Sequence, residues 1–318
     1  MSTDPKAHDT RTIRERCREL IDYCNGAELT DLARDCIDVA IRHGLWNDPA
    51  QRPIDFDPRL SPQPVYEAEQ FPVCRYLELH CRIIQAELVA RESGSEAAFL
   101  PVEEPLVSAG GWDEVVFYEG GIRYETAARA FPATAAVVDE LPQDVRQCGV
   151  IMLSRLRPGT HIMPHCGLTN RRLRVHLGLR IPQDAVLRIA DRFLQWEEGK
   201  CLIFDDSFEH EIWQFGQFSR VVLLVDTPHP AAAGTMVHPG CTELEQRIAT
   251  LLKQRGLRRM AREAETGRLT LEPDDSNARL IRRIMAELNA ASVGLDEHGE
   301  LVCDRAPLAL GPQGSGSP

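Results

Sequence analysis

The sequence predicts a mainly β core flanked by α-helices at both ends. Between residues 115 and 225, short runs of β-branched and apolar residues alternate with Gly, Pro and Asp, a texture typical of antiparallel strands that close on themselves. On either side of this stretch, apolar residues recur at helical spacing instead. With 318 residues, the chain has room for one large domain and extensions.

The N-terminal region, residues 1–95, is expected to be helical and proline-rich and to pack on the β core. Apolar residues at helical spacing over residues 10–43 are interrupted at Asn25-Gly26, which predicts a helical hairpin. Prolines recur over residues 49–72, and a further helix is expected over residues 74–91.

The most informative predicted strand covers residues 171–180, because its alternation is strict. One face carries only apolar residues, so the other face must carry Arg172, Arg174 and His176. An edge strand with its cations in water would explain this pattern. A pocket for an anionic ligand would explain it as well, since residues 146–230 hold 11 basic and 9 acidic side chains in a chain of net charge −12.

A second strand, residues 219–225, is apolar on both faces and is therefore expected to be buried, with Arg220 at its mouth. A buried guanidinium requires a carboxylate partner. Asp205, Asp206 or Asp226 could supply it from within the protein, and a dicarboxylate ligand would do equally well.

His165 and His210 form a candidate metal pair. The first lies in a turn before a strand and the second in a strand further along, a layout by which a small barrel aims two ligands into its mouth. Imidazoles suit iron, copper, nickel and zinc alike. A facial triad would add a carboxylate two residues after the first histidine, but that position is Gly167, so spacing alone leaves the metal site incomplete.

Three stretches of the chain carry a resemblance to a known family: PGTHIMPHCGLTNRRLRVHLGLRIP, WEEGKCLIFDDSFEHEIWQ and RVVLLVDTPHP, with a weaker one, GGWDEVVFYEGG, at residues 110–121. Together they resemble the catalytic domain of the aspartyl/asparaginyl β-hydroxylases, which are iron(II)- and 2-oxoglutarate-dependent oxygenases. The resemblance implies a double-stranded β-helix, a jelly-roll or cupin-like barrel, over residues 96–230.

The resemblance also implies the iron site. His165 and His210 would be the metal ligands. This family characteristically has glycine at the position of Gly167 and binds iron with two protein side chains, so that the place of the carboxylate ligand is vacant.

The cosubstrate residues follow from the same resemblance. Arg220 would pair with the distal carboxylate of 2-oxoglutarate and Ser154 would assist there, while Arg174 and His176 would lie near the 1-carboxylate. The candidates for contacting the substrate are Arg172 and Trp112.

We therefore expect a dioxygenase that uses Fe(II), 2-oxoglutarate and O2 to hydroxylate an unactivated C–H bond. The expected position is the β-carbon of an Asp or Asn residue in a cytosolic peptide or protein, including the precursor peptide of a natural product. A small amino-acid derivative is a further candidate substrate. Two alternatives stay open: a metal-dependent hydrolase with Asp205 and Asp206 as bases, and a non-catalytic barrel that binds an acidic ligand. Cys166, beside His165, could also act as a redox sensor or third ligand.

Composition restricts the partners and the compartment. The net charge of −12 argues against nonspecific binding to nucleic acid, and no apolar run reaches the length needed to span a bilayer. The N-terminal residues contain no apolar stretch of signal-peptide type, so we expect a cytoplasmic protein. Ten cysteines without a CxxC pair predict mostly reduced, buried thiols.

The C-terminal region, residues 231–310, is expected to be a helical extension, with helices over residues 244–264 and 278–288. Residues 311–318 are rich in Gly, Ser and Pro and are expected to be disordered.

Overall fold

The computed structural model describes residues 5–92, 99–102, 106–119 and 122–232, together with four short strands near the C-terminus. The chain forms two compact units, Met1–Met236 and Val237–Pro318. Among the helices of the described residues, none combines the length and the hydrophobicity needed to cross a membrane.

The first unit begins with the predicted helical hairpin. Its two helices are α1 (Pro5–Gly26) and α2 (Thr30–Arg42). Ile21 and Ala40, one from each helix, are buried together with Trp46 and Phe56 of the segment that follows, and this small core fixes the hairpin to that segment. The helix expected over residues 74–91 is also confirmed, as α3 (Pro72–Glu92).

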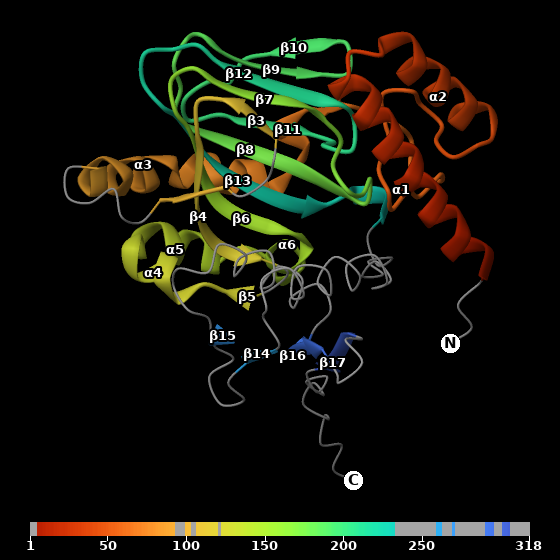
Figure 1. Cartoon of the computed structure of the whole chain (residues 1–318). Coiled ribbons are helices and arrows are strands. Elements are labelled where there is room, and N and C mark those ends of the chain that lie inside the picture. Colours follow the sequence, from red (N-terminus) through yellow and green to blue (C-terminus); the bar gives the residue numbers. More distant parts are fainter. Residues whose placement is uncertain are drawn as a thin grey trace. The chain divides into compact units, whose positions relative to one another are not determined.

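Two antiparallel sheets form the centre of this unit (Figure 1). The larger sheet contains β1 (Val65–Tyr66), β2 (Leu100–Pro101), β4 (Trp112–Glu119), β5 (Ile122–Arg123), β6 (Val150–Leu156), β8 (Arg172–Arg180), β11 (Cys201–Phe204) and β13 (Arg220–Pro228). The smaller sheet contains β3 (Val107–Ala109), β7 (Thr160–His165), β9 (Ala185–Ile189), β10 (Arg192–Leu194) and β12 (His210–Gln214). Single turns of 3-10 helix lie at Ala68–Gln70 and Pro230–Ala232.

The order of the strands identifies the fold. The larger sheet runs β1-β11-β8-β13-β6-β4-β2, with β5 beside β4, and the smaller sheet runs β10-β9-β12-β7-β3. The chain crosses between the sheets as it passes from β6 to β13, so that β12 lies between β7 and β9, and β13 lies between β6 and β8. This winding is a double-stranded β-helix, as the family resemblance implied.

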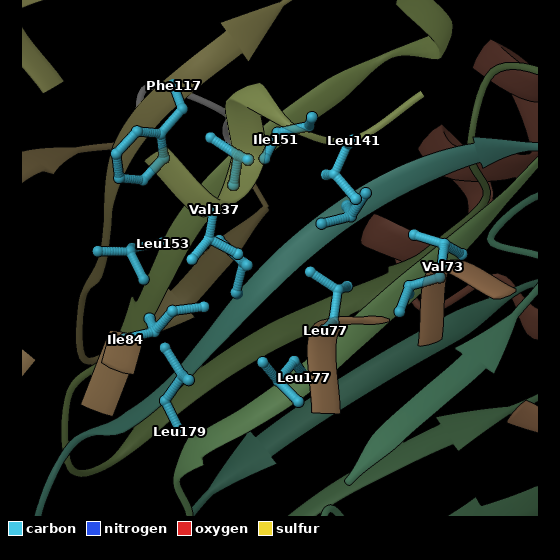
Figure 2. Packing of buried hydrophobic residues seen from close by; sticks show 14 of the residues in the cluster. Val73, Leu77, Ile84, Phe117, Val137, Leu141, Ile151, Leu153, Leu177 and Leu179 are labelled. Carbon is cyan, nitrogen blue, oxygen red and sulfur yellow. The ribbon is translucent and has the colours of Figure 1, made fainter. Parts of the chain in front are cut away.

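Helices cover the outer face of the larger sheet. Figure 2 shows Leu77 and Ile84 of α3 packed among residues that include Leu177 and Leu179 of β8. The expected burial of β13 on both faces is confirmed, because its alternate residues enter the core under the helices and the core between the two sheets.

Strand β8 confirms the strict alternation of its sequence. Its leucine and valine side chains lie in the helix-covered core, which leaves Arg172, Arg174 and His176 on the face toward the second sheet. The strand pairs with both β11 and β13, so the expectation of a solvated edge strand is wrong.

Two expectations about the helices need correction. Residues 115–225 were expected to be strands, yet three short helices interrupt them: α4 (Glu125–Ala130), α5 (Pro132–Asp139) and α6 (Gln143–Cys148). Pro132 begins α5, where a missing N–H costs nothing, and alanines favour helix in α4 and α5.

The second correction concerns the C-terminal unit, whose described residues form a sheet. Its strands are β14 (Arg259–Arg262), β15 (Leu269–Thr270), β16 (Ala290–Leu295) and β17 (Leu301–Arg305), in the order β15-β14-β16-β17. The helical extension expected over 231–310 is therefore wrong at these strands, and β14 falls inside the run 244–264. Pairing of β14 with β16 outweighs the high helix propensity of Arg, Met and Ala in this segment. The helix expected over 278–288 and the tail 311–318 lie outside the described residues.

Candidate active site

The two candidate metal ligands meet on neighbouring strands of the smaller sheet. His165 ends β7 and His210 begins β12, their Cα atoms are partners in the strand register, and their ring centroids lie 4.1 Å apart. Within the described part of the chain, no group of three or more His, Cys, Asp or Glu residues has the arrangement of a metal site.

Both rings are held in the tautomer that suits metal binding. Nδ1 of His165 lies 2.8 Å from the carbonyl of Met163, and Nδ1 of His210 lies 2.9 Å from the carbonyl of Phe208. Because a carbonyl only accepts, each Nδ1 must carry the proton, which leaves Nε2 as the coordinating nitrogen. Burial and the neighbouring His165 lower the pKa of His210 well below its usual range, which favours the neutral form that a metal requires.

Gly167 lies against a carboxylate that the sequence did not place there. The Gly167 N–H donates to the Asp206 carbonyl at 2.6 Å, and a Cβ atom at position 167 would lie 2.7 Å from Asp206 Cγ. The Asp206 side chain is buried; its Oδ2 pairs with Arg174 at 3.0 Å, and its Oδ1 has no hydrogen-bond partner among the described residues. Asp206 therefore fills the space into which a side chain at position 167 would point.

Arg220 is a buried cation that pairs with no carboxylate of the described residues. Only 1% of its surface is exposed, and burial lowers its pKa to about 9. It donates to Ser154 Oγ at 3.4 Å and lies 4.2 Å above the ring of Trp196, while its Nε has no partner in this part of the structure. Ser154 also accepts a hydrogen bond from the indole of Trp112 at 3.1 Å, which places Trp112 at the Arg220 end of the site.

The three aspartates considered as partners for Arg220 are engaged elsewhere. Asp205 accepts from Gln51 at 2.9 Å, whereas Asp206 and Asp226 both pair with Arg174 at 3.0 Å. The alternative in which one of them neutralises Arg220 is therefore wrong, and a dicarboxylate ligand is the other partner that the sequence suggested.

His176 supplies a second unpartnered donor beside Arg220. Its Nδ1 accepts from the indole of Trp196 at 3.1 Å and lies 3.5 Å from Arg220 Nη2. The proton is therefore on Nε2, which is buried and has no hydrogen-bond partner among the described residues. The Phe204 ring contacts both His176 and His210, so this polar group adjoins the histidine pair.

Arg172 and Arg174 lie on the predicted face but are held by internal ion pairs. Nε of Arg174 contacts Asp226 Oδ1 at 3.0 Å, and Arg172 Nη1 lies 3.6 Å from Asp226 Oδ2. Burial alone would raise the pKa of Asp226, but Arg174 and Arg172 hold it below its usual value. Of the predicted residues, the structure thus joins Trp112, Ser154, His176 and Arg220 in one hydrogen-bonded group, and sets Arg172 and Arg174 in another.

Sequence reasoning missed the roles of Trp196 and Asp206. Trp196 stands in a stretch that carries the family resemblance, but nothing in its spacing shows that its indole orients His176. Asp206 was considered only as a base or as a partner of Arg220, because its approach to Gly167 arises from the fold.

Part of the chain matches a family of known proteins. Residues 78–230 match the family model described as aspartyl/asparaginyl beta-hydroxylase. Human aspartyl/asparaginyl beta-hydroxylase is 41% identical over 156 residues, which are 48% of this chain and 21% of that protein. The ornithine lipid ester-linked acyl 2-hydroxylase of Rhizobium tropici is 32% identical over 180 residues, which are 54% of this chain and 63% of that protein.

The matches are partial on both sides. The chain spans about a fifth of the length of the human relative. Among solved structures, a prolyl hydroxylase from Trichoplax adhaerens is similar over 49% of this chain and 81% of that one, with 14% identity and a TM-score of 0.34. Residues 78–230, which are just under half of the chain, are thus similar to the aspartyl/asparaginyl beta-hydroxylase family.

Proposed function

We propose that the barrel is an Fe(II)- and 2-oxoglutarate-dependent dioxygenase that hydroxylates an unactivated C–H bond. The observation that carries the proposal is the buried guanidinium of Arg220, which no described carboxylate neutralises, in a group that adjoins two metal-ready histidines. A zinc hydrolase would need the histidine pair but would leave this buried cation without a purpose.

The residues present fit both groups. His165 and His210 would hold the metal through Nε2, since their Nδ1 atoms donate to backbone carbonyls. Arg220 and Ser154 would take the distal carboxylate of 2-oxoglutarate. His176 offers its Nε2–H to the 1-carboxylate end, where Arg174 is the second candidate.

When bound together, iron and 2-oxoglutarate supply the oxidising chemistry, in which O2 is reduced, the keto acid is decarboxylated and one oxygen enters the substrate C–H bond. The chain's own residues orient and shield this chemistry. Phe204 and Phe208 are buried in the core between the sheets, which keeps water from the inner side of the histidine pair. Arg220 fixes the direction of the keto acid, because its guanidinium offers donors in a rigid plane.

The substrate class follows from the relatives' names and is part of the proposal. One relative is named for aspartyl and asparaginyl residues and the other for an ornithine-linked acyl chain. We place this chain with the first, acting on the β-carbon of Asp or Asn in a cytoplasmic peptide or protein, because its identity to that relative is higher. Arg172 is the candidate contact for a substrate carboxylate.

An anaerobic titration with Fe(II) and then 2-oxoglutarate tests the assignment. Direct chelation produces a weak charge-transfer band in the visible range, which should appear with the native chain and vanish in His210→Ala. Iron binding without this band would favour a hydrolase, and binding of neither would favour a ligand-binding barrel. Incubation with Asp peptides, Asn peptides and ornithine lipid would then identify the substrate class by a gain of one oxygen.

A further inference from the structure

The segment of residues 46–57 is bonded to both loops that carry the proposed metal ligands. On one side, the Asp55 N–H donates to the Leu168 carbonyl at 2.9 Å, three residues after His165. On the other side, the Arg52 N–H donates to the Ser207 carbonyl at 3.1 Å. A single strap from the N-terminal region thus ties the loop after the first ligand to the loop before the second.

Arg18 of α1 adds a side-chain clamp next to the first ligand. Its Nη2 donates to the Cys166 carbonyl at 2.8 Å and its Nη1 to the Gly167 carbonyl at 3.2 Å. These are the two carbonyls that directly follow His165. A guanidinium with two donors in one plane fixes the direction of both carbonyls, and with them the path of the chain as it leaves the ligand.

Arg52 makes the matching contact next to the second ligand. Its Nη2 lies 2.5 Å from Glu209 Oε2, and its Nη1 donates to the Pro49 carbonyl. Only 7% of the Arg52 side chain is exposed, and Glu209 directly precedes His210. The buried pair therefore anchors the start of β12 to the strap.

The pairing of β7 with β12 and the bond from the Gly167 N–H to the Asp206 carbonyl set the backbones of the two ligands side by side, and the affinity for a metal depends on how firmly the adjoining loops hold this arrangement. Each ring is oriented by a carbonyl of its own strand or loop, at Met163 and Phe208, so nothing in those bonds sets one loop against the other. The N-terminal segment bonds to both loops, and it lies outside the residues that match the family model, 78–230.

We infer that Arg18 and Arg52 are positioning residues of the metal site, which hold the loops of His165 and His210 at the spacing that binding requires. This inference rests on the proposed function. It predicts that the N-terminal segment acts on the affinity for the metal and leaves the Arg220 end of the site unchanged.

Titration of the full chain with Mn(II) tests the inference, because the electron paramagnetic resonance signal of aqueous Mn(II) reports the unbound metal without any turnover. Arg18→Ala and Arg52→Ala should each weaken binding by about tenfold or more, as losses in the outer shell of a metal site commonly do. Arg18→Lys should retain part of the affinity, since an ammonium can still donate to one carbonyl. Arg16→Ala is the matched control, because Arg16 lies on the same helix and pairs with the exposed Glu19 at 2.8 Å.

The outcomes separate this inference from the proposed function. Affinities of Arg18→Ala and Arg52→Ala within about twofold of the native value, with Mn(II) binding still lost in His210→Ala, would overturn the positioning role alone. A native chain that does not bind Mn(II), or a His210→Ala variant that binds it equally, would overturn the proposed metal site. If Arg52→Ala does not fold, Arg18→Ala and Arg18→Lys decide the question, provided that metal-free thermal unfolding matches that of Arg16→Ala.

Discussion

Replacing Arg220 by methionine should change stability and ligand binding in opposite directions. Burial lowers the pKa of the Arg220 guanidinium to about 9, which disfavours the charged form in the ligand-free barrel by about 5 kcal/mol. The cation–π contact with Trp196 offsets about 2 kcal/mol of this cost. Methionine removes both the cost of the buried charge and the cation–π contact while filling a similar volume. The free energy of unfolding should therefore stay unchanged or rise by up to about 3 kcal/mol.

Ser154 and His176, which contact Arg220, each keep another hydrogen bond in this variant. Ser154 keeps the hydrogen bond from Trp112, and Nδ1 of His176 keeps the bond from Trp196. Binding of 2-oxoglutarate, by contrast, loses two charge-assisted hydrogen bonds worth about 1.5 kcal/mol or more each. The affinity should fall by about a hundredfold or more.

Thermal unfolding with and without saturating Mn(II) and 2-oxoglutarate measures both effects, because a ligand raises the midpoint only if it binds the folded state. The variant should unfold at the native midpoint or above it and should no longer respond to 2-oxoglutarate. Arg123→Met is the matched control, since Arg123 pairs with Asp139 at 2.8 Å and should lose stability while keeping the ligand response. A lower midpoint for Arg220→Met with an unchanged ligand response would refute the reasoning, because Arg220 would then be a structural cation.

Three further changes give distinct results. His210→Ala should abolish Mn(II) binding and hydroxylation together, as measured by titration and product mass, and an active variant would show that the metal lies elsewhere. Gly167→Asp should destabilise the fold by about 1–3 kcal/mol in denaturant unfolding, because its Cβ would lie 2.7 Å from Asp206; the double variant with Asp206→Ala should recover stability, and no recovery would contradict this cause. Burial, with Asp206 nearby, raises the pKa of Asp205 to about 7, so the folded state holds a proton that the unfolded state releases near pH 4. The free energy of unfolding should therefore fall as pH rises from about 4 to about 7, and Asp205→Asn should flatten this part of the curve; an unchanged slope would exclude Asp205 as its source.

The strands and the charged face of the barrel were predictable because they depend on local alternation. The continuous apolar run around Val222 predicts a strand buried on both faces. The alternation of apolar and charged residues around Arg174 predicts a strand with one polar face toward the interior. What the sequence could not show is which charges meet across strands. Asp226 pairs with Arg174, and Arg220 has no carboxylate partner among the described residues; the register of β13 against β8 places Asp226 opposite Arg174.

The errors arose where tertiary pairing outweighs local propensity. Helical spacing in the C-terminal region suggested helices, yet β14 pairs with β16. The sequence also could not show that Asp206 approaches Gly167, because this contact depends on how the fold brings together the loop after His165 and the loop before His210. The strap that bonds Asp55 to Leu168 lies in a proline-rich passage that has no periodicity to read.

The charges inside the barrel indicate which of the two side chains, Asp or Asn, suits the site. Three arginines, Arg172, Arg174 and Arg220, lie with two aspartates, Asp206 and Asp226, so these five side chains together carry a net charge of +1. Fe(II) and doubly charged 2-oxoglutarate cancel each other, and neutral imidazoles add nothing. A substrate carboxylate would neutralise the remainder, whereas an amide or an acyl chain would leave it buried and uncompensated. Matched Asp and Asn peptides should therefore differ in kcat/KM in favour of Asp, by about tenfold or more if one charge-assisted hydrogen bond separates them. Equal values would mean that Asp226 or solvent already balances Arg172, and that the charge of the site does not select the substrate.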